Sequence, residues 1–224
     1  MRAPASRGLA MVELLVGSAV GLIVVAAGSA LVARNVTENR TLLIETRLMQ
    51  DLRTAADLVS RDLRRAGYWA SAASGVHSDD GSSVLANPYA AITPDTAASD
   101  AVRFRYSRDV TENGVVDSNE EFGFRLRNGA LELQLGDGNW QALTDPATLT
   151  VTAFSVEPRS EETSLARFCA GPCAVGSTTC PPRQQVKSFA VVIAARSAVD
   201  ANVTRSVQSS VRLRNVPIVG SCEA

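Results

Sequence analysis

The 224-residue sequence lacks several features on which common protein functions depend. Its formal net charge is -1, so the excess of basic residues that direct nucleic-acid binding uses is missing. It contains one histidine, His77, and has no phosphate-binding glycine loop, G-x-S-x-G or H-E-x-x-H motif. We therefore do not expect an enzyme. Aromatic residues make up only 5% of the chain, whereas 46% of it is apolar, and that apolar fraction is unevenly distributed.

Proline is absent between Pro4 and Pro88, so no proline interrupts a helix in that interval. The segment from Leu9 to Ala33 has 19 apolar residues in 25. About 20 apolar residues in a helix cross the hydrocarbon core of a bilayer. The run is longer than the apolar region of a cleaved secretory signal, which has about 7 to 15 residues. We expect a retained membrane anchor, with a cleaved signal as the alternative.

Glu13 is the only charged residue between Gly8 and Arg34. An ionised carboxylate inside a membrane costs about 3 kcal/mol or more unless it is paired. A short basic leader ends at Gly8, and a cut after that glycine would place a positive amine on Leu9. Glu13 would then be the fifth residue of the mature protein, and a neighbouring copy could supply its amine as a counter-charge. The alternative is that Glu13 reaches lipid headgroups at the membrane edge.

Residues 7–16, Arg-Gly-Leu-Ala-Met-Val-Glu-Leu-Leu-Val, resemble the signal of type IV pilins and type II secretion pseudopilins. This resemblance implies that a prepilin peptidase cuts after Gly8 and methylates Leu9, although the usual first mature residue of the family is phenylalanine. Gly17 and Gly21 form a G-x-x-x-G pattern, which lets helices approach closely in an apolar medium. We assign both glycines, with Glu13, to assembly. The alternative is that the glycines only soften the helix.

The segment after Arg34 is amphipathic. Apolar residues recur there at helical spacing on one stripe, namely Ile44, Leu48, Leu52, Ala55, Val59 and Leu63. The opposite face carries Arg47, Arg53, Asp57, Arg61 and Arg64. We predict one helix from about Leu9 to Ala66, ended by Gly67, with its second half packed against a sheet. Residues 58–68 resemble the helix end of PilW-type minor pilins.

Residues 70–100 are rich in Ser, Ala, Asp and Gly and predict a surface loop. Alternating apolar and polar residues then predict strands at 101–106, 122–126, 131–135, 149–156, 186–196 and 204–214, and Asn128-Gly129 predicts a two-residue hairpin turn. The expected fold class is α+β, a type IV pilin-like ladle with the long helix packed on an antiparallel sheet. Its parts are a leader (1–8), a transmembrane and filament-core half-helix (9–33), an amphipathic half-helix (34–67), and a loop and sheet domain (68–224).

An acidic segment between the first two strands fits the spacing of a calcium-binding loop. The ligand positions of an EF-hand loop fall on Asp109, Thr111, Asn113, the carbonyl of Val115, Asp117 and Glu120, and Gly114 takes the position of the sharp turn. Thr111 departs from the usual Asp or Asn, and the flanking segments read as strands. The sequence therefore predicts a Ca2+ site on a hairpin, with a plain polar turn as the alternative.

The chain has four cysteines, Cys169, Cys173, Cys180 and Cys222. An even number in a domain outside the cytoplasmic membrane favours disulfides, because that compartment is oxidising. Three pairings are open, and we favour Cys173 with Cys180 and Cys169 with Cys222. Zinc is the rival interpretation, but C-x3-C-x6-C with a distant fourth cysteine is not a usual zinc spacing.

Together these features resemble a PilW-like minor pilin. The resemblance implies an inner-membrane, single-pass prepilin with its carboxyl-terminal domain in the periplasm, which later joins the filament or its tip. Its implied partners are other minor and major pilins, the prepilin peptidase and the inner-membrane assembly platform. The alternatives are a type II secretion pseudopilin and a membrane-anchored adhesin or binding module.

Overall fold

The computed structural model describes residues 11–75 and 85–222. The leader, with Gly8 and Leu9, and the histidine His77 lie outside these described residues. The chain divides into two compact units, Met1–Ile44 and Glu45–Ala224, which are described separately below. One helix, α1 (Met11–Leu63), contributes to both units.

In the first unit, every described residue is helical. Large apolar side chains are exposed all round this part of α1, as Met11 (85%) and Leu22 (71%) illustrate. A helix that is apolar on all faces and uncovered is typical of a membrane span. Among the described residues, α1 is the helix long and apolar enough to cross a membrane, with an 18-residue window of mean hydropathy 2.3.

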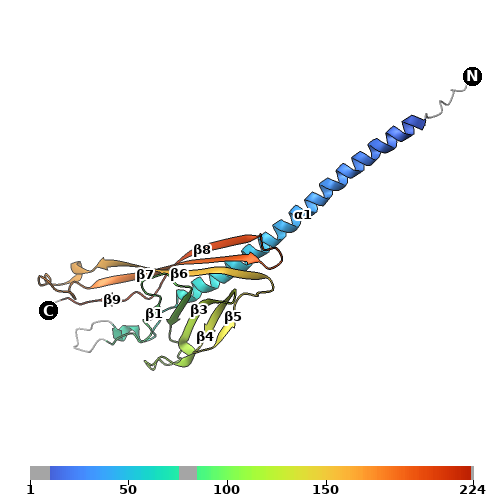
Figure 1. The fold of residues 1–224 in the computed structure, drawn as a ribbon. Coiled ribbons are helices and arrows are strands. Elements are labelled where there is room, and N and C mark those ends of the chain that lie inside the picture. Colours follow the sequence, from blue (N-terminus) through green and yellow to red (C-terminus); the bar gives the residue numbers. More distant parts are fainter. Residues whose placement is uncertain (1–10, 76–84, 223–224) are drawn as a thin grey trace, which may run out of the picture. The chain divides into compact units, whose positions relative to one another are not determined.

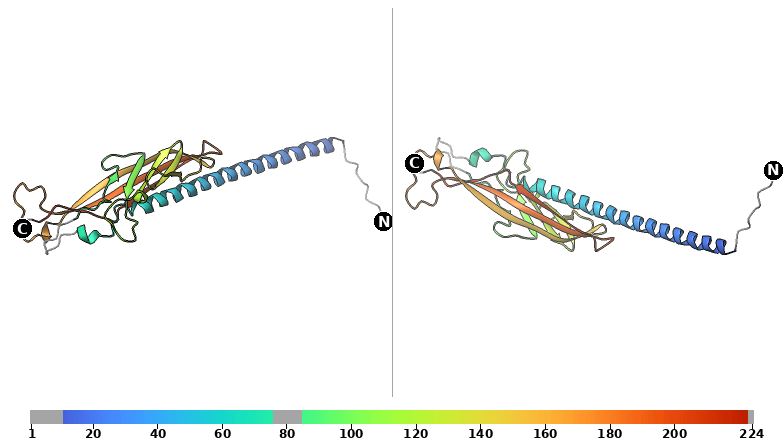
Figure 2. Two further views of the ribbon diagram at one scale, coloured as in Figure 1. Left: turned by 90° about the horizontal axis from the view of Figure 1, so that it is seen from below. Right: turned by 90° about the horizontal axis from the view of Figure 1, so that it is seen from above.

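In the second unit, one face of α1 is buried and the opposite face is exposed. Leu52, Val59 and Leu63 are each 0% exposed, whereas Arg53 and Asp57 on the opposite face are exposed. This part of α1 packs against the sheets and lies along strand β8 (Thr204–Arg212), as the Ser60 Oγ to Ser209 Oγ contact of 3.2 Å shows (Figures 1 and 2). Burial of a Leu or Val side chain contributes about 1.5 to 3 kcal/mol, so the apolar stripe accounts for the docking of this half of the helix.

Gly67 closes the turn that follows α1. The helix ends at Leu63, three residues before the predicted end, and turns follow as far as Gly67. Gly67 has φ +73°, a conformation that L side chains rarely adopt, and its N–H donates to the Arg105 carbonyl at 2.8 Å. The helix end is thereby joined to the sheet. Within its described residues, 70–75 and 85–100, the predicted loop is mostly irregular and contains one short 3-10 helix, η1 (Ala72–Gly75), and a two-residue strand, Ile92–Thr93.

In the part of the chain that the structure describes, the strands form two antiparallel sheets where the sequence predicted one. The first sheet has the order β1-β2-β3-β4-β5. Its members are β1 (Ile92–Thr93), β2 (Ala101–Arg105), β3 (Glu121–Arg127), β4 (Ala130–Leu135) and β5 (Trp140–Ala142). The turn between β3 and β4 uses Asn128 and Gly129 with φ of 51° and 75°, which confirms the predicted two-residue hairpin.

The second sheet is built on a long hairpin. Strand β6 (Leu149–Ser164) pairs with β7 (Arg183–Ser197), from Leu149 opposite Ser197 to Ser164 opposite Arg183. Strands β8 and β9 (Ile218–Val219) both pair with β7. Figure 1 shows the far end of the β6–β7 hairpin, in orange, reaching well past strands β3 to β5. Two further 3-10 helices, η2 (Ser118–Glu120) and η3 (Ala166–Phe168), lie in connections.

The core lies between α1 and the covered faces of the two sheets. Phe104 and Phe124 are stacked with ring centroids 6.3 Å apart, and both are almost fully buried. On β7, Phe189, Val191, Ile193 and Ala195 are buried at alternate positions, as expected for a strand with one covered face. The α+β class and the packing of a long helix on antiparallel strands are confirmed.

Candidate functional site

Two kinds of candidate site were predicted, one in the amino-terminal segment and one in the domain. Glu13 lies in the first described turn of α1. At Gly17 and Gly21, no heavy atom lies within 4 Å of the place that a Cβ would occupy. Both glycines therefore lie on open helix surface and are available for contact with another helix. Whether Glu13, Gly17 and Gly21 act in assembly stays a prediction.

The acidic loop brings part of the predicted calcium ligand set together. Carboxylate oxygens of Asp109, Asp117 and Glu120 all lie within 4.8 Å of one another. Asp109 is half-buried, Asp117 is exposed, and Glu120 is 0% exposed. Three carboxylates at this separation repel one another unless a cation or hydrogen-bond donors offset their charge.

Hydrogen bonds from the loop's own backbone supply part of that compensation. Glu120 Oε1 accepts the N–H of Arg108 at 2.7 Å, and its Oε2 accepts the N–H of Asp117 at 2.9 Å. Asp109 Oδ2 accepts the N–H of Asn113 at 3.2 Å. Glu120 thus joins residues near the two ends of the loop through hydrogen bonds. A carboxylate offers about four lone-pair sites, so Glu120 has acceptor capacity left beside these two hydrogen bonds.

The other predicted ligands are arranged differently. Thr111 is exposed, and Asn113 Oδ1 accepts the N–H of Val115 at 2.6 Å. The Val115 carbonyl accepts the hydroxyl of Tyr89 at 3.2 Å. Tyr89 therefore holds the loop through the Val115 carbonyl oxygen, which the calcium hypothesis assigned to the metal.

Sequence analysis missed the pair that fixes this loop, Tyr89 and Glu112. The Tyr89 hydroxyl donates to Glu112 Oε1 at 3.0 Å, and the ring is 0% exposed. Burial raises the pKa of Tyr89 well above its usual range, and the Glu112 carboxylate acts in the same direction. Burial also tends to raise the pKa of Glu112, but hydrogen bonds from side chains and backbone amides outweigh it and lower that pKa. No periodic pattern marks Tyr89, because it stands in an irregular segment.

The calcium hypothesis predicts a specific thermal shift. In the weak affinity range of extracellular modules, 5 mM Ca2+ would add about 1 to 2 kcal/mol to the free energy of unfolding and raise the Tm by a few degrees. Asp109→Asn combined with Asp117→Asn should abolish the shift, whereas Asp57→Asn on the exposed face of α1 should preserve it. Differential scanning calorimetry of the full chain in nonionic detergent measures both. An unchanged wild-type Tm in Ca2+ and in EGTA would exclude the site.

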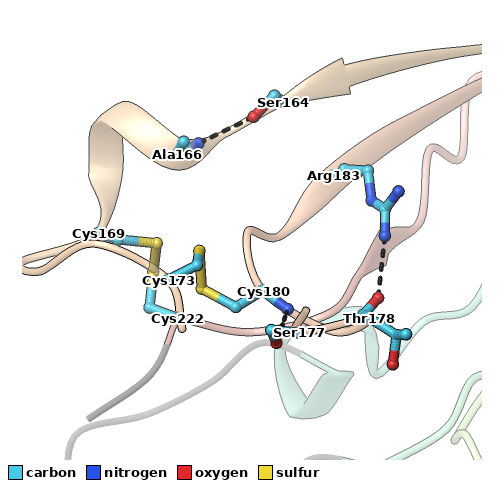
Figure 3. Close-up of a disulfide and its surroundings, with 9 residues drawn as sticks. All are labelled: Ser164, Ala166, Cys169, Cys173, Ser177, Thr178, Cys180, Arg183 and Cys222. Carbon is cyan, nitrogen blue, oxygen red and sulfur yellow. Dashed lines mark hydrogen bonds between the residues drawn. A yellow bond between two sulfur atoms is a disulfide. The ribbon is translucent and has the colours of Figure 1, made fainter. Parts of the chain in front are cut away.

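The four cysteines form two disulfides in the structure. Cys169 is bonded to Cys222 and Cys173 to Cys180, which is the pairing that the sequence analysis favoured (Figure 3). The tail is also held by backbone hydrogen bonding, because the Ser221 N–H donates to the Thr179 carbonyl at 3.1 Å and β9 pairs with β7. The carboxyl-terminal segment is thus fastened to the β6–β7 connection, as Figure 3 shows for Cys222. Disulfides of this kind fit an oxidising compartment.

Comparison with known proteins adds one positive finding. A family model described as PpdB, prepilin peptidase-dependent protein B, matches residues 41–213. The match covers about three quarters of the chain and contains the strands of both sheets except β9, but not the amino-terminal residues 7–16. No curated protein and no solved structure matches the chain.

Proposed function

Because the chain belongs to the prepilin peptidase-dependent protein B family, we propose that it is a minor pilin of a type IV pilus. In this proposal the protein is an inner-membrane prepilin that is processed after Gly8. It then takes part in initiating the pilus or forming its tip. The PilW-like assignment made from residues 58–68 is part of the same proposal.

The observation that carries the proposal is the agreement of two separate parts of the chain. The family match begins at residue 41, whereas the basic leader, Gly8 and Glu13 all precede it. The predicted processing signal and the match to a peptidase-dependent family therefore rest on residues that do not overlap. An exposed apolar helix and a disulfide-bonded domain fit an anchor in the inner membrane with the domain in the periplasm.

Glu13 has a defined part in this proposal. Cleavage after Gly8 creates an amine on Leu9, and in a filament that amine of one subunit would lie against Glu13 of the next. Pairing offsets the cost of a carboxylate in an apolar medium, so the pair would fix the helix register between subunits. Gly17 and Gly21 would let neighbouring helices approach in the same bundle.

Mass spectrometry of the mature protein tests the proposal directly. We expect the wild-type chain, purified from its membrane, to begin at a methylated Leu9. A chain that begins at Met1 or at an unmodified residue within the apolar run would contradict it. A type II secretion pseudopilin would carry the same signal, so co-purification with pilus components or with secretion components separates those two functions.

A further inference from the structure

Three arginines meet where α1 ends and the last long strand ends. Arg64 follows the final residue of α1, Arg212 is the last residue of β8, and Arg214 lies two residues further on. They line an open pocket of about 400 Å³ with Leu213 and Val216. The Arg214 N–H donates to the Arg64 carbonyl at 3.4 Å, so the two segments are joined at the pocket.

Among the described residues, these three arginines differ from Arg61 of α1 and Arg205 of β8 in having no partner for their charge. Arg65 stacks on the Tyr106 ring at 4.2 Å, Arg61 pairs with Asp62 at 3.7 Å, and Arg205 pairs with Glu45. Within residues 11–75 and 85–222, the guanidinium groups of the pocket form no ion pair, hydrogen bond or ring contact.

Compensation of the helix dipole does not account for the cluster. Carbonyls at the end of a helix carry partial negative charge, which a basic residue can offset. Here three carbonyls in the last turn of α1 already accept backbone N–H groups, at 3.2, 3.0 and 3.1 Å; they belong to Ser60, Asp62 and Leu63. In the turn after the helix, Asn215 Nδ2 donates to the carbonyls of Arg65 and Ala66, at 3.4 and 2.9 Å. Arg212 and Arg214 also belong to β8 and the segment after it, so they are not part of the helix whose dipole would be compensated. The three cations are therefore held together at a site that the fold itself does not use.

We propose that the Arg64–Arg212–Arg214 pocket docks an acidic segment of a neighbouring protein subunit in the filament. This inference rests on the proposed function, which places the domain among other subunits. Guanidinium groups present planar donor forks that match carboxylates, and charge pairs across an interface set its register. The buried Leu213 and the half-buried Val216 offer an apolar floor for the methylene groups of a glutamate.

The alternative anions fit less well. Residues 45–224 contain 18 basic and 21 acidic side chains, a net charge of -3, so the domain as a whole repels an extended polyanion such as nucleic acid. Arg64 directly follows the end of α1, about 28 Å of helical rise beyond Glu45. A lipid headgroup would meet the helix nearer its apolar half, so lipid is not the expected ligand of this pocket. The three arginines of the pocket are exposed, whereas small-molecule sites bury most of their ligand.

A binding assay with a defined probe tests this inference. Fluorescence anisotropy of a labelled hexaglutamate peptide is measured with the full chain in nonionic detergent. We expect saturable binding that weakens as salt increases. Arg212→Ala combined with Arg214→Ala should raise the Kd roughly tenfold, the effect of two lost charge pairs.

A matched control removes the same charge elsewhere. Arg159→Ala combined with Arg167→Ala deletes two exposed arginines outside the pocket and should change the Kd less than about twofold. Equal weakening by both double variants, or no binding by the wild type, would overturn the inference. Displacement of the peptide by millimolar inorganic phosphate would overturn it too, because the pocket would then be a small-oxyanion site.

Failure of this inference is distinguishable from failure of the proposed function. In cells, Arg212→Glu with Arg214→Glu should leave cleavage and methylation at Leu9 unchanged while lowering the amount of the protein in filaments. If Leu9 of the wild type is never methylated, the proposed function fails whatever the peptide assay gives. If Leu9 is methylated and the charge-reversed variant enters filaments normally, only the docking site is wrong.

Discussion

Gly8→Ala is expected to leave the protein eight residues longer than the mature wild type and without a methylated amine. A peptidase that cuts after residue 8 must bring the backbone there close to its catalytic groups, and glycine permits the closest approach because it has no Cβ. The precursor should accumulate in the membrane and stay out of filaments. Immunoblotting shows the size difference, and intact mass spectrometry identifies both ends of the chain.

Gly17→Ala is the matched control for this experiment. It makes the same chemical change within the apolar run, at a position where a Cβ would meet no heavy atom within 4 Å. This variant should be cut and methylated like the wild type. If Gly8→Ala also yields the wild-type size and surface display, the chain is an adhesin or binding module on a plain anchor, and the minor-pilin proposal is wrong.

Removing the Cys169–Cys222 disulfide should cost more stability than removing Cys173–Cys180. The first closes a loop of 53 residues in sequence separation, which contains all of β7 and β8, whereas the second closes one of 7. In the chain-entropy description the expected losses in the free energy of unfolding are about 4 and about 2.5 kcal/mol. The larger loss is a sizeable part of the 5 to 15 kcal/mol typical of a domain.

Urea denaturation of the two double-serine variants measures both losses. Unfolding can be followed by tryptophan fluorescence in the full chain, because Trp69 is 7% exposed and its surroundings change on unfolding. The Cys173→Ser/Cys180→Ser variant serves as the control for loss of two sulfurs without loss of the long loop closure. Equal losses for the two variants, or the reverse order, would contradict the expectation.

Regular patterns in the sequence predicted most of the domain. The stripe from Ile44 to Leu63 predicted the covered face of α1, which is buried from Leu48 onward, and Asn128-Gly129 predicted the turn that joins β3 to β4. Gly67 was predicted to end the helix; α1 itself ends at Leu63, and Gly67, with φ +73°, closes the turns that follow. Each of these features is determined by residues that are close in sequence, so a local sequence pattern is enough to predict it.

Features that depend on distant residues were not predictable in this way. Strands of two residues, β1 and β9, carry no periodic signal and exist because β2 and β7 offer them an edge. Division of the strands into two sheets depends on three-dimensional packing. In the acidic loop, Asp109, Asp117 and Glu120 of the predicted ligand set lie within 4.8 Å of one another, but the use of the Val115 carbonyl by Tyr89 follows from a contact between residues 26 positions apart.

The Cys169–Cys222 bond also decides how this domain responds to a pulling force. If tension acts between α1 and the carboxyl end, it passes across the two sulfurs, and the backbone between Cys169 and Cys222 bears none of it. Without the bond, those 53 residues could unfold under tension and extend to roughly 180 Å. With it, β7 and β8 stay inside a closed loop and retain their register under load. The oxidised domain is therefore expected to be much less extensible than the reduced one.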